Sequence, residues 1–298
     1  MKPKRVVRSA VELRAEEIVD AVVTEMGDFD LRIPGAMAGM SSGDPVSYLE
    51  QHRHEYVRTV RDLLGHRPPA GVVRVLELGA FFGVVSISLG KLGYDVTAAD
   101  LPEFMELPAQ VQRYKAASVQ SVCVRLERFV LPFPDEAFDV VLMCETLEHL
   151  NFNPLPLLKE INRVGSKGSL FYLSLPNAAS LYNRARVLRG EAVGVDVESF
   201  FRQLEPESSE IVNDHWREYT VAEVRLMLGR LGYRVEKQYY FSLGETLEQS
   251  SLRRRAARLL FERLPWLKEN QTTIAVRERR TDLRFRVPDT VHGTVTEL

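Results

Sequence analysis

Two acidic side chains and an imidazole stand close together in the segment CETLEHL, residues 144–150, directly after an apolar run over 138–144. Residues at i, i+3 and i+4 share one side of a helical turn, so Glu145, Glu148 and His149 can converge. An imidazole has an ordinary pKa of about 6.5 and can take the proton of a hydroxyl near neutral pH, with Glu148 orienting the ring. The segment therefore predicts catalytic roles for His149 and Glu148.

Two further interpretations of this segment stay open. Glu145, Glu148 and His149 could instead hold a divalent ion, and two carboxylates with one imidazole suit Mg²⁺ or Mn²⁺ better than zinc. They could also brace the loop through hydrogen bonds without any part in chemistry. Residue types and spacing alone do not choose among a base, a metal site and a structural brace.

A second group of residues surrounds a glycine-bearing turn. A near-continuous apolar run predicts a buried strand over 72–78, followed by a helix over 84–92 and a strand over 94–99 that Asp100 closes. Ligands of such sheets bind beyond the carboxyl ends of the strands. The site is therefore expected to include Glu77, Gly79, Gly83 and Asp100.

The spacing of these glycines excludes a dinucleotide fingerprint. That fingerprint is G-x-G-x-x-G, whereas Gly79 and Gly83 are spaced G-x-x-x-G with Phe81 between them. The carboxylate of Glu77 before the first glycine would repel a pyrophosphate and suit a cationic ligand. The pattern therefore favours a positively charged ligand over a dinucleotide.

This turn resembles motif I of the class I S-adenosylmethionine-dependent methyltransferases. That family usually has E/D-x-G-x-G-x-G, and Phe81 stands here where its middle glycine would be. The match continues with Glu127 after the third predicted strand, with LPFPD at 131–135, and with FDVV at 138–141. The cluster E-x-x-E-H is similar to that of the ubiquinone-pathway O-methyltransferases, where it holds a metal ion. The resemblance covers about residues 70–242 and the strand expected at 272–276.

The resemblance implies an α/β fold: a Rossmann-like, mostly parallel sheet of seven strands in the order 3-2-1-4-5-7-6, flanked by helices. It places Asp100 at the ribose hydroxyls of S-adenosyl-L-methionine and Glu127 at the adenine. The full set expected to bind this cofactor is Glu77, Gly79, Ala80, Gly83, Asp100, Leu101, Glu127 and Cys144.

An insertion over 178–219 interrupts the alternation of strands and helices and resembles the family's lid over the methyl acceptor. Asn177, His215, Trp216 and Tyr219 are expected to contact the acceptor, because an aromatic ring beside polar groups suits a sugar or a ring. Two of these residues also have a structural interpretation: Asn177 could cap a strand and Trp216 could anchor the lid.

The parts of the chain follow from these elements. They are N-terminal helices with a flap at 28–43 (1–70), the cofactor-binding core (71–177), the acceptor lid (178–219), the rest of the sheet (220–279) and a loose tail (280–298).

Composition narrows the function further. The chain has 298 residues, a net charge of −2 and a pI near 6.4, so there is no overall charge signal for nucleic acid. The sequence contains no apolar stretch of 18 residues, so no membrane span is expected. Cys123 and Cys144 lie in apolar runs, as reduced thiols of a cytoplasmic protein would. A homodimer is compatible with these features.

The function predicted from the sequence is transfer of a methyl group to a hydroxyl of a small polar acceptor, such as a sugar, a glycan precursor or a phenolic metabolite. Two alternatives remain: N- or C-methylation of a lipid or quinone-like metabolite, and a non-catalytic module that binds the cofactor.

Overall fold

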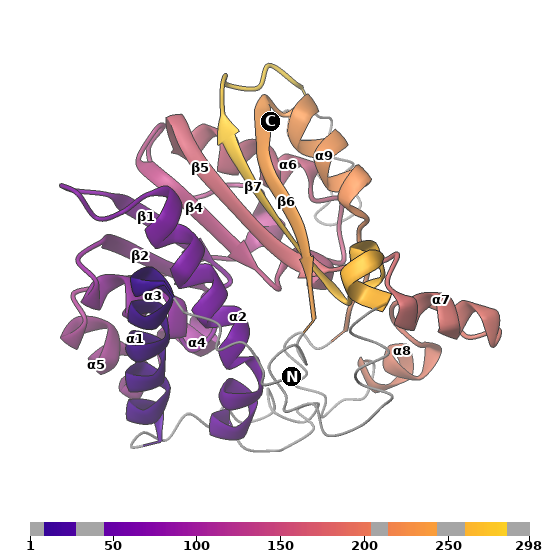
Figure 1. Cartoon of the computed structure of the whole chain (residues 1–298). Helices are drawn as coiled ribbons and strands as arrows, with labels where there is room; N and C mark the ends of the chain where they lie inside the picture. The colour runs from indigo at the N-terminus through magenta and orange to yellow at the C-terminus, as the bar shows by residue number, and fades with distance from the viewer. Residues whose placement is uncertain (1–8, 28–44, 204–213, 243–259, 285–298) are drawn as a thin grey trace. The chain divides into compact units, whose positions relative to one another are not determined.

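The computed structural model describes residues 9–27, 45–203, 214–242 and 260–284. The chain divides into two compact units, Met1–Cys123 and Val124–Leu298, and each is described by itself (Figure 1). This division falls inside the predicted core at 71–177, and the predicted domain boundaries stay predictions. The expected flap at 28–43 lies outside the described residues, as does the tail from 285 onward.

Seven strands form the sheet, in the order β3-β2-β1-β4-β5-β7-β6, which confirms the predicted order. Strand β7 runs antiparallel to both of its neighbours, whereas the pairs β1/β2, β2/β3 and β4/β5 are parallel. The strands are β1 (Arg74–Leu78), β2 (Asp95–Asp100), β3 (Gln120–Cys123), β4 (Phe138–Cys144), β5 (Gly165–Pro176), β6 (Tyr233–Phe241) and β7 (Asn270–Arg277).

Three helices of the first unit pack on one another: α1 (Ala10–Met26), α2 (Pro45–His66) and α3 (Val84–Lys91) (Figure 1). The side chain of Ser9 caps α1 by accepting a hydrogen bond from the amide of Glu12 at 3.2 Å. Helix α3 is buried from Val84 to Leu89, including the two serines Ser86 and Ser88.

The segment after β2 differs from its prediction. The sequence indicates one helix over 101–114, but two short helices form, α4 (Pro102–Met105) and α5 (Pro108–Ala116). Pro108 has no backbone N–H to donate and disfavours helical dihedrals at Leu107, so the first helix ends before it and a second begins at the proline.

The second unit adds helices to the other strands: α6 (Leu155–Val164), α7 (Leu181–Leu188), α8 (Val197–Gln203) and α9 (Val221–Arg230). Helix α9 begins with a full capping box between Thr220 and Glu223 and packs on β6 and β7. Short 3₁₀ helices lie at η1 (Leu126–Arg128), η2 (Leu147–His149) and η4 (Pro265–Leu267). Within the residues described, no helix is long and apolar enough to cross a bilayer.

Arg163 on α6 holds the proline-rich loop that precedes β4. Its guanidinium donates to the carbonyls of Leu131 and Phe133 at 3.0 and 2.9 Å, and to Asp135 Oδ1 at 2.8 Å. Two more hydrogen bonds, at 2.9 and 2.8 Å, go to the carboxylate of Glu160. One side chain therefore sets the course of the chain between η1 and β4.

Arg163→Lys is expected to lower the free energy of unfolding by about 1–3 kcal/mol, because a single ammonium cannot serve carbonyls and carboxylates that a planar fork reaches together. Urea denaturation measures this loss. Arg234→Lys is the matched control, because Arg234 is more than half exposed and pairs only with surface glutamates. Equal, small losses in both variants would contradict the role given to Arg163.

Candidate functional site

The turn between β1 and α3 has a left-handed backbone at three positions: Gly79 (φ 74°), Phe81 (φ 49°) and Gly83 (φ 72°). Glycine adopts this conformation without penalty, whereas phenylalanine does so at a cost. The amides of Gly79 and Ala80 donate to the carbonyl of Ala99 at 2.9 and 3.3 Å, which ties the turn to the end of β2.

Asp100, at the end of β2, organises this turn. Its Oδ2 accepts the amide N–H of Phe81 at 2.6 Å and its Oδ1 accepts that of Leu101 at 2.7 Å. Burial raises the pKa of Asp100 to about 6, although the two amides oppose that rise. The carboxyl is therefore mostly ionised at neutral pH, and each oxygen keeps a lone pair for a further donor.

Glu77 plays a different part from that of Asp100. Its side chain is buried, it accepts a hydrogen bond from the hydroxyl of Ser86 on α3, and burial raises its pKa to about 8. A carboxyl that is largely protonated at pH 7 supplies little charge to a cation. The geometry therefore favours support of the turn by Glu77 over the direct attraction of a cationic ligand that the sequence suggested.

The raised pKa of Glu77 predicts that stability falls as the pH rises. The unfolded chain releases this proton near pH 4.5, whereas the folded chain keeps it to about pH 8, so the folded state binds more protons in that window. Between pH 5 and 8, urea denaturation is expected to show a loss on the order of 3 kcal/mol in the wild type. Glu77→Gln, which stays neutral, is expected to remove most of this loss. A loss of the same size in the variant would contradict the assignment.

In the second unit, Glu145 follows β4 in a left-handed conformation (φ 45°). Its amide donates to the carbonyl of Ser174 at 2.8 Å, and its Oε1 accepts the Ser174 hydroxyl at 2.9 Å. These two bonds direct Glu145 toward the neighbouring strand β5. Glu145 does not belong to the group of side chains that the structure gathers as potential metal ligands.

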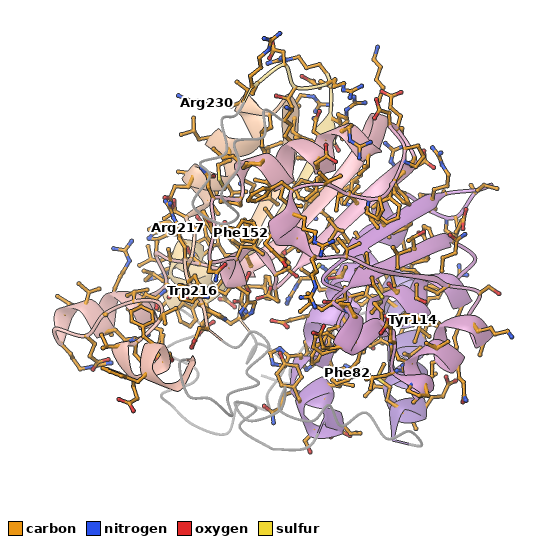
Figure 2. All side chains as sticks on the ribbon, turned by 180° about the vertical axis from the view of Figure 1, so that it is seen from behind. Phe82, Tyr114, Phe152, Trp216, Arg217 and Arg230 are labelled. Atoms are coloured by element: carbon orange, nitrogen blue, oxygen red, sulfur yellow. The ribbon has the colours of Figure 1, made fainter. Side chains whose placement is uncertain are left out.

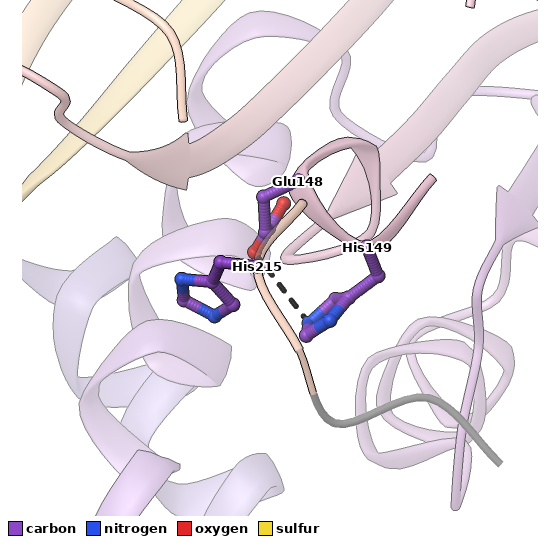
Figure 3. A group of neighbouring side chains, drawn as sticks. All are labelled: Glu148, His149 and His215. Carbon is purple, nitrogen blue, oxygen red and sulfur yellow. Dashed lines mark ion pairs between the residues drawn. The ribbon is translucent and has the colours of Figure 1, made fainter. Parts of the chain in front are cut away.

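That group consists of Glu148, His149 and His215, with one donor atom from each lying within 4.8 Å of the others (Figure 3). The carboxylate of Glu148 is fully buried, and its Oε1 lies 3.8 Å from His149 Nε2. The two imidazole rings meet edge to face, with centroids 4.9 Å apart. The sequence predicted the Glu148–His149 half of this cluster and assigned His215 only to the acceptor.

Hydrogen bonds at Nδ1 orient both rings. His149 Nδ1 lies 3.2 Å from the backbone carbonyl of Asp214, which can only accept, so this nitrogen carries the proton and Nε2 keeps its lone pair. His215 Nδ1 lies 3.3 Å from Glu218 Oε1. The other oxygen of Glu218 accepts from Asn183 Nδ2 at 2.5 Å. The amide of Arg217 donates to the carbonyl of Glu148 at 3.3 Å, which fixes the His215 segment against η2.

The two histidines differ in charge. Burial, together with the neighbouring His215, lowers the pKa of His149 to about 4, so its ring is neutral at pH 7. Burial also acts to lower the pKa of His215, but the hydrogen bond to Glu218 and the carboxylates of Glu148, Glu218 and Asp214 together raise it above the ordinary value. The cluster therefore places a neutral imidazole beside one that protonates more readily.

Asn177 and Tyr219 are built into the fold. Asn177 is fully buried, and its Nδ2 donates to the carbonyls of Trp266 and Lys268, each at 2.9 Å. Tyr219 is also buried, and its carbonyl accepts from the amide of Ala178 at 3.2 Å and from Gln271. These contacts favour the structural interpretation of both residues, and their contact with an acceptor stays a prediction.

Trp216 is half-buried, and its ring stacks on Phe200 of α8 with centroids 5.7 Å apart and 20° between the planes (Figure 2). Sequence reasoning missed Phe200, Glu218 and Asn183. Glu218 had a signal, because it follows His215 at i+3. Asn183 reaches Glu218, and Phe200 reaches Trp216, only through tertiary packing.

The remaining predicted cofactor residues keep their expected places at strand ends. Glu127 lies half-buried on η1, directly after β3, and Cys144 closes β4, where its carbonyl accepts from the Thr146 hydroxyl at 2.8 Å. Ala80 and Leu101 flank the turn at Asp100. Contact of these residues with the cofactor stays a prediction.

The described part of the insertion exposes apolar side chains. Helices α7 and α8, with the link between them, expose several large apolar side chains: Tyr182, Val187, Leu188, Val193, Val197, Phe200 and Phe201. Leu188 is 88% exposed. An acceptor with an apolar part therefore stays an alternative prediction.

Comparison with known proteins places residues 76–173 in a family described as methyltransferase domain. The chain is 30% identical over 141 residues to the ubiquinone biosynthesis O-methyltransferase of Xanthomonas oryzae pv. oryzae, and 30% identical over 134 residues to that of Xanthomonas euvesicatoria pv. vesicatoria. Each match covers 45% of this chain and 52% of the relative. The chain thus spans about half the length of the curated relatives it matches.

Solved structures share the fold at low sequence identity. A Pyrococcus horikoshii protein superposes with a TM-score of 0.51 at 14% identity, over 85% of this chain and 98% of that one. A Haloferax volcanii complex of a methyltransferase with a methyltransferase activator gives a TM-score of 0.50 at 17% identity, over 92% and 100%. The chain therefore contains a class I S-adenosylmethionine-dependent methyltransferase domain and is distantly similar to the ubiquinone biosynthesis O-methyltransferases.

Proposed function

We propose that this protein transfers the methyl group of S-adenosyl-L-methionine to a hydroxyl of a small acceptor molecule. The observation that carries the proposal is the cluster of Glu148, His149 and His215, which follows strand β4 of the methyltransferase domain and presents an oriented imidazole. The similarity to ubiquinone biosynthesis O-methyltransferases supports oxygen as the methylated atom.

The cofactor, when bound, supplies an electrophilic methyl group on a sulfonium. Asp100 has a lone pair on each oxygen for the ribose hydroxyls. The glycine-bearing turn between β1 and α3 is the proposed place of the methionine part. Glu127 is the proposed partner of the adenine amino group. The donors and acceptors present in each unit therefore suit this cofactor.

His149 takes the proton in this scheme. As the methyl carbon bonds to the acceptor oxygen and leaves sulfur, the hydroxyl becomes an oxonium, which is far more acidic than the free hydroxyl. A neutral imidazole with a low pKa is therefore basic enough to accept the proton at Nε2. The products are a methyl ether, neutral S-adenosylhomocysteine and one proton. Correct placement of the hydroxyl supplies much of the remaining acceleration.

A divalent ion is a second candidate for this cluster, supported by the converging donors of Glu148, His149 and His215. Two imidazoles and one carboxylate suit Mn²⁺ or zinc better than Mg²⁺, which prefers oxygen ligands. The ion would lower the pKa of a bound hydroxyl. Equilibrium dialysis of Mn²⁺ against the wild type and Glu148→Gln, with activity assayed after chelation and after metal is added back, separates the two roles.

An acceptor with an apolar part is the second candidate for the substrate. The exposed apolar side chains of α7 and α8, with the stacked rings of Phe200 and Trp216, could cover a hydrocarbon tail or a ring. A panel of polyhydroxylated sugars, simple catechols and catechols with isoprenoid tails compares the two acceptor classes directly.

The test begins with calorimetric titration of S-adenosylmethionine and S-adenosylhomocysteine, with NAD as the control. Binding of both sulfur ligands and none of NAD is expected, followed by transfer of labelled methyl to members of the acceptor panel. Binding without transfer to any acceptor would favour the non-catalytic module. Absence of binding would overturn the proposal at its base.

A further inference from the structure

Four aromatic rings cluster at the turn between β1 and α3: Tyr48 on α2, Phe81 and Phe82 within the turn, and Phe104 on α4. The ring of Phe81 lies 4.1 Å from Phe82, 5.0 Å from Phe104 and 5.7 Å from Tyr48, measured between centroids. Phe82 and Phe104 are buried, whereas Phe81 and Tyr48 are half-exposed. The cluster therefore has a closed base and an accessible side formed by two rings.

The backbone of Phe81 has a left-handed conformation, which is unfavourable for phenylalanine. For any residue with a Cβ this conformation is about 1–2 kcal/mol less stable than the right-handed one. The hydrogen bond from its amide to Asp100 Oδ2 at 2.6 Å holds that conformation, while the ring packs on Phe82, Phe104 and Tyr48. Strain of this kind gathers at functional sites, and here it keeps an aromatic ring where motif I of the family has a glycine.

An accessible aromatic face beside carboxylates is a recognition site for an organic cation. The ring quadrupole attracts positive charge, and the charges of Asp100 and the nearby Glu103 add to that attraction. The turn that Phe81 occupies is the part of the fold assigned above to the methionine portion of the cofactor. That portion carries the sulfonium, which is positive before methyl transfer and neutral afterwards.

We propose that the rings of Phe81 and Tyr48 form an aromatic wall that selects the sulfonium of S-adenosylmethionine over neutral S-adenosylhomocysteine. This inference rests on the proposed function, because it assigns a discriminating role within the same cofactor site. The wall favours the charged substrate and assists release of the neutral product. Phe81 stands where motif I of the family usually has a glycine, and in this proposal its ring adds selectivity for the charged sulfur ligand over the neutral one.

The decisive experiment replaces Phe81 with phenylalanines that carry one, three or five ring fluorines. Fluorine withdraws electron density from the ring face and changes its size little. Calorimetry is expected to show stepwise weaker binding of S-adenosylmethionine, reaching about 2- to 30-fold for the fluorine-rich ring, with binding of S-adenosylhomocysteine nearly constant. A ring that serves only packing would give no such dependence on charge.

Substitutions with standard amino acids provide the second part of the test. Phe81→Leu and Tyr48→Leu are expected to lower the affinity ratio between the two sulfur ligands, whereas Phe81→Tyr keeps it. Tyr182→Leu on α7 is the control, because Tyr182 is 62% exposed and lies in the second unit, outside this cluster. Equal weakening of both ligands would overturn the aromatic wall and leave the proposed function standing. Failure of the wild type to bind either ligand would overturn both.

Discussion

His149→Ala is expected to lower kcat by about 10²- to 10⁴-fold while the affinity for S-adenosylmethionine stays within about twofold. A positioned proton acceptor contributes acceleration of this size. The hydrogen bond from His149 Nδ1 to the carbonyl of Asp214 orients the ring and leaves Nε2 to accept the proton. Steady-state kinetics with an acceptor found by the screen, together with calorimetry of the cofactor, measures the two quantities separately.

The matched control for this variant is His66→Ala. His66 Nδ1 also lies near a backbone carbonyl, that of Asp62 at 2.8 Å, but His66 is at the end of α2 in the first unit. Loss of the same local interaction there should leave kcat within about threefold of the wild type. A His149→Ala enzyme with near-normal kcat would show that the cluster braces the loop.

Gly83→Ala is expected to lower the free energy of unfolding by about 2–5 kcal/mol, from a left-handed backbone and from overpacking together. A Cβ at Gly83 would lie 2.6 Å from Tyr114 Cε1 and Oη and 2.8 Å from Gln110 Nε2. Both side chains are fully buried on α5, so neither can move aside cheaply. Urea denaturation measures the loss, and the affinity for S-adenosylmethionine should fall with it.

Gly93→Ala separates the two causes. Gly93 also has a left-handed backbone (φ 95°), but a Cβ there meets no atom within 4 Å. Its loss should therefore be limited to the conformational part, about 1–2 kcal/mol. If Gly83→Ala and Gly93→Ala cost the same, contact of the turn with α5 contributes little.

The order of strands was implied by the family resemblance and is confirmed. The places of Glu77, Gly79, Gly83 and Asp100 at the ends of strands and in the turn could be predicted from the residues themselves, because each depends on local pattern. A buried strand needs a continuous apolar run, and a tight turn into a helix needs glycine at left-handed positions. The sequence predicted that Glu145, Glu148 and His149 converge, but of these only Glu148 and His149 join the cluster with His215. Pro108, which divides one expected helix into two, was visible in the sequence.

Tertiary structure alone decided which groups join those residues and how they are charged. His215 comes to Glu148 from 67 positions further along the chain, while hydrogen bonds to β5 direct Glu145 away from the cluster. Burial, which no local pattern reports, leaves Glu77 largely protonated and His149 neutral at pH 7. Ionisation depends on the solvent that packing removes, so the chemistry of these carboxyl and imidazole groups is a property of the folded chain.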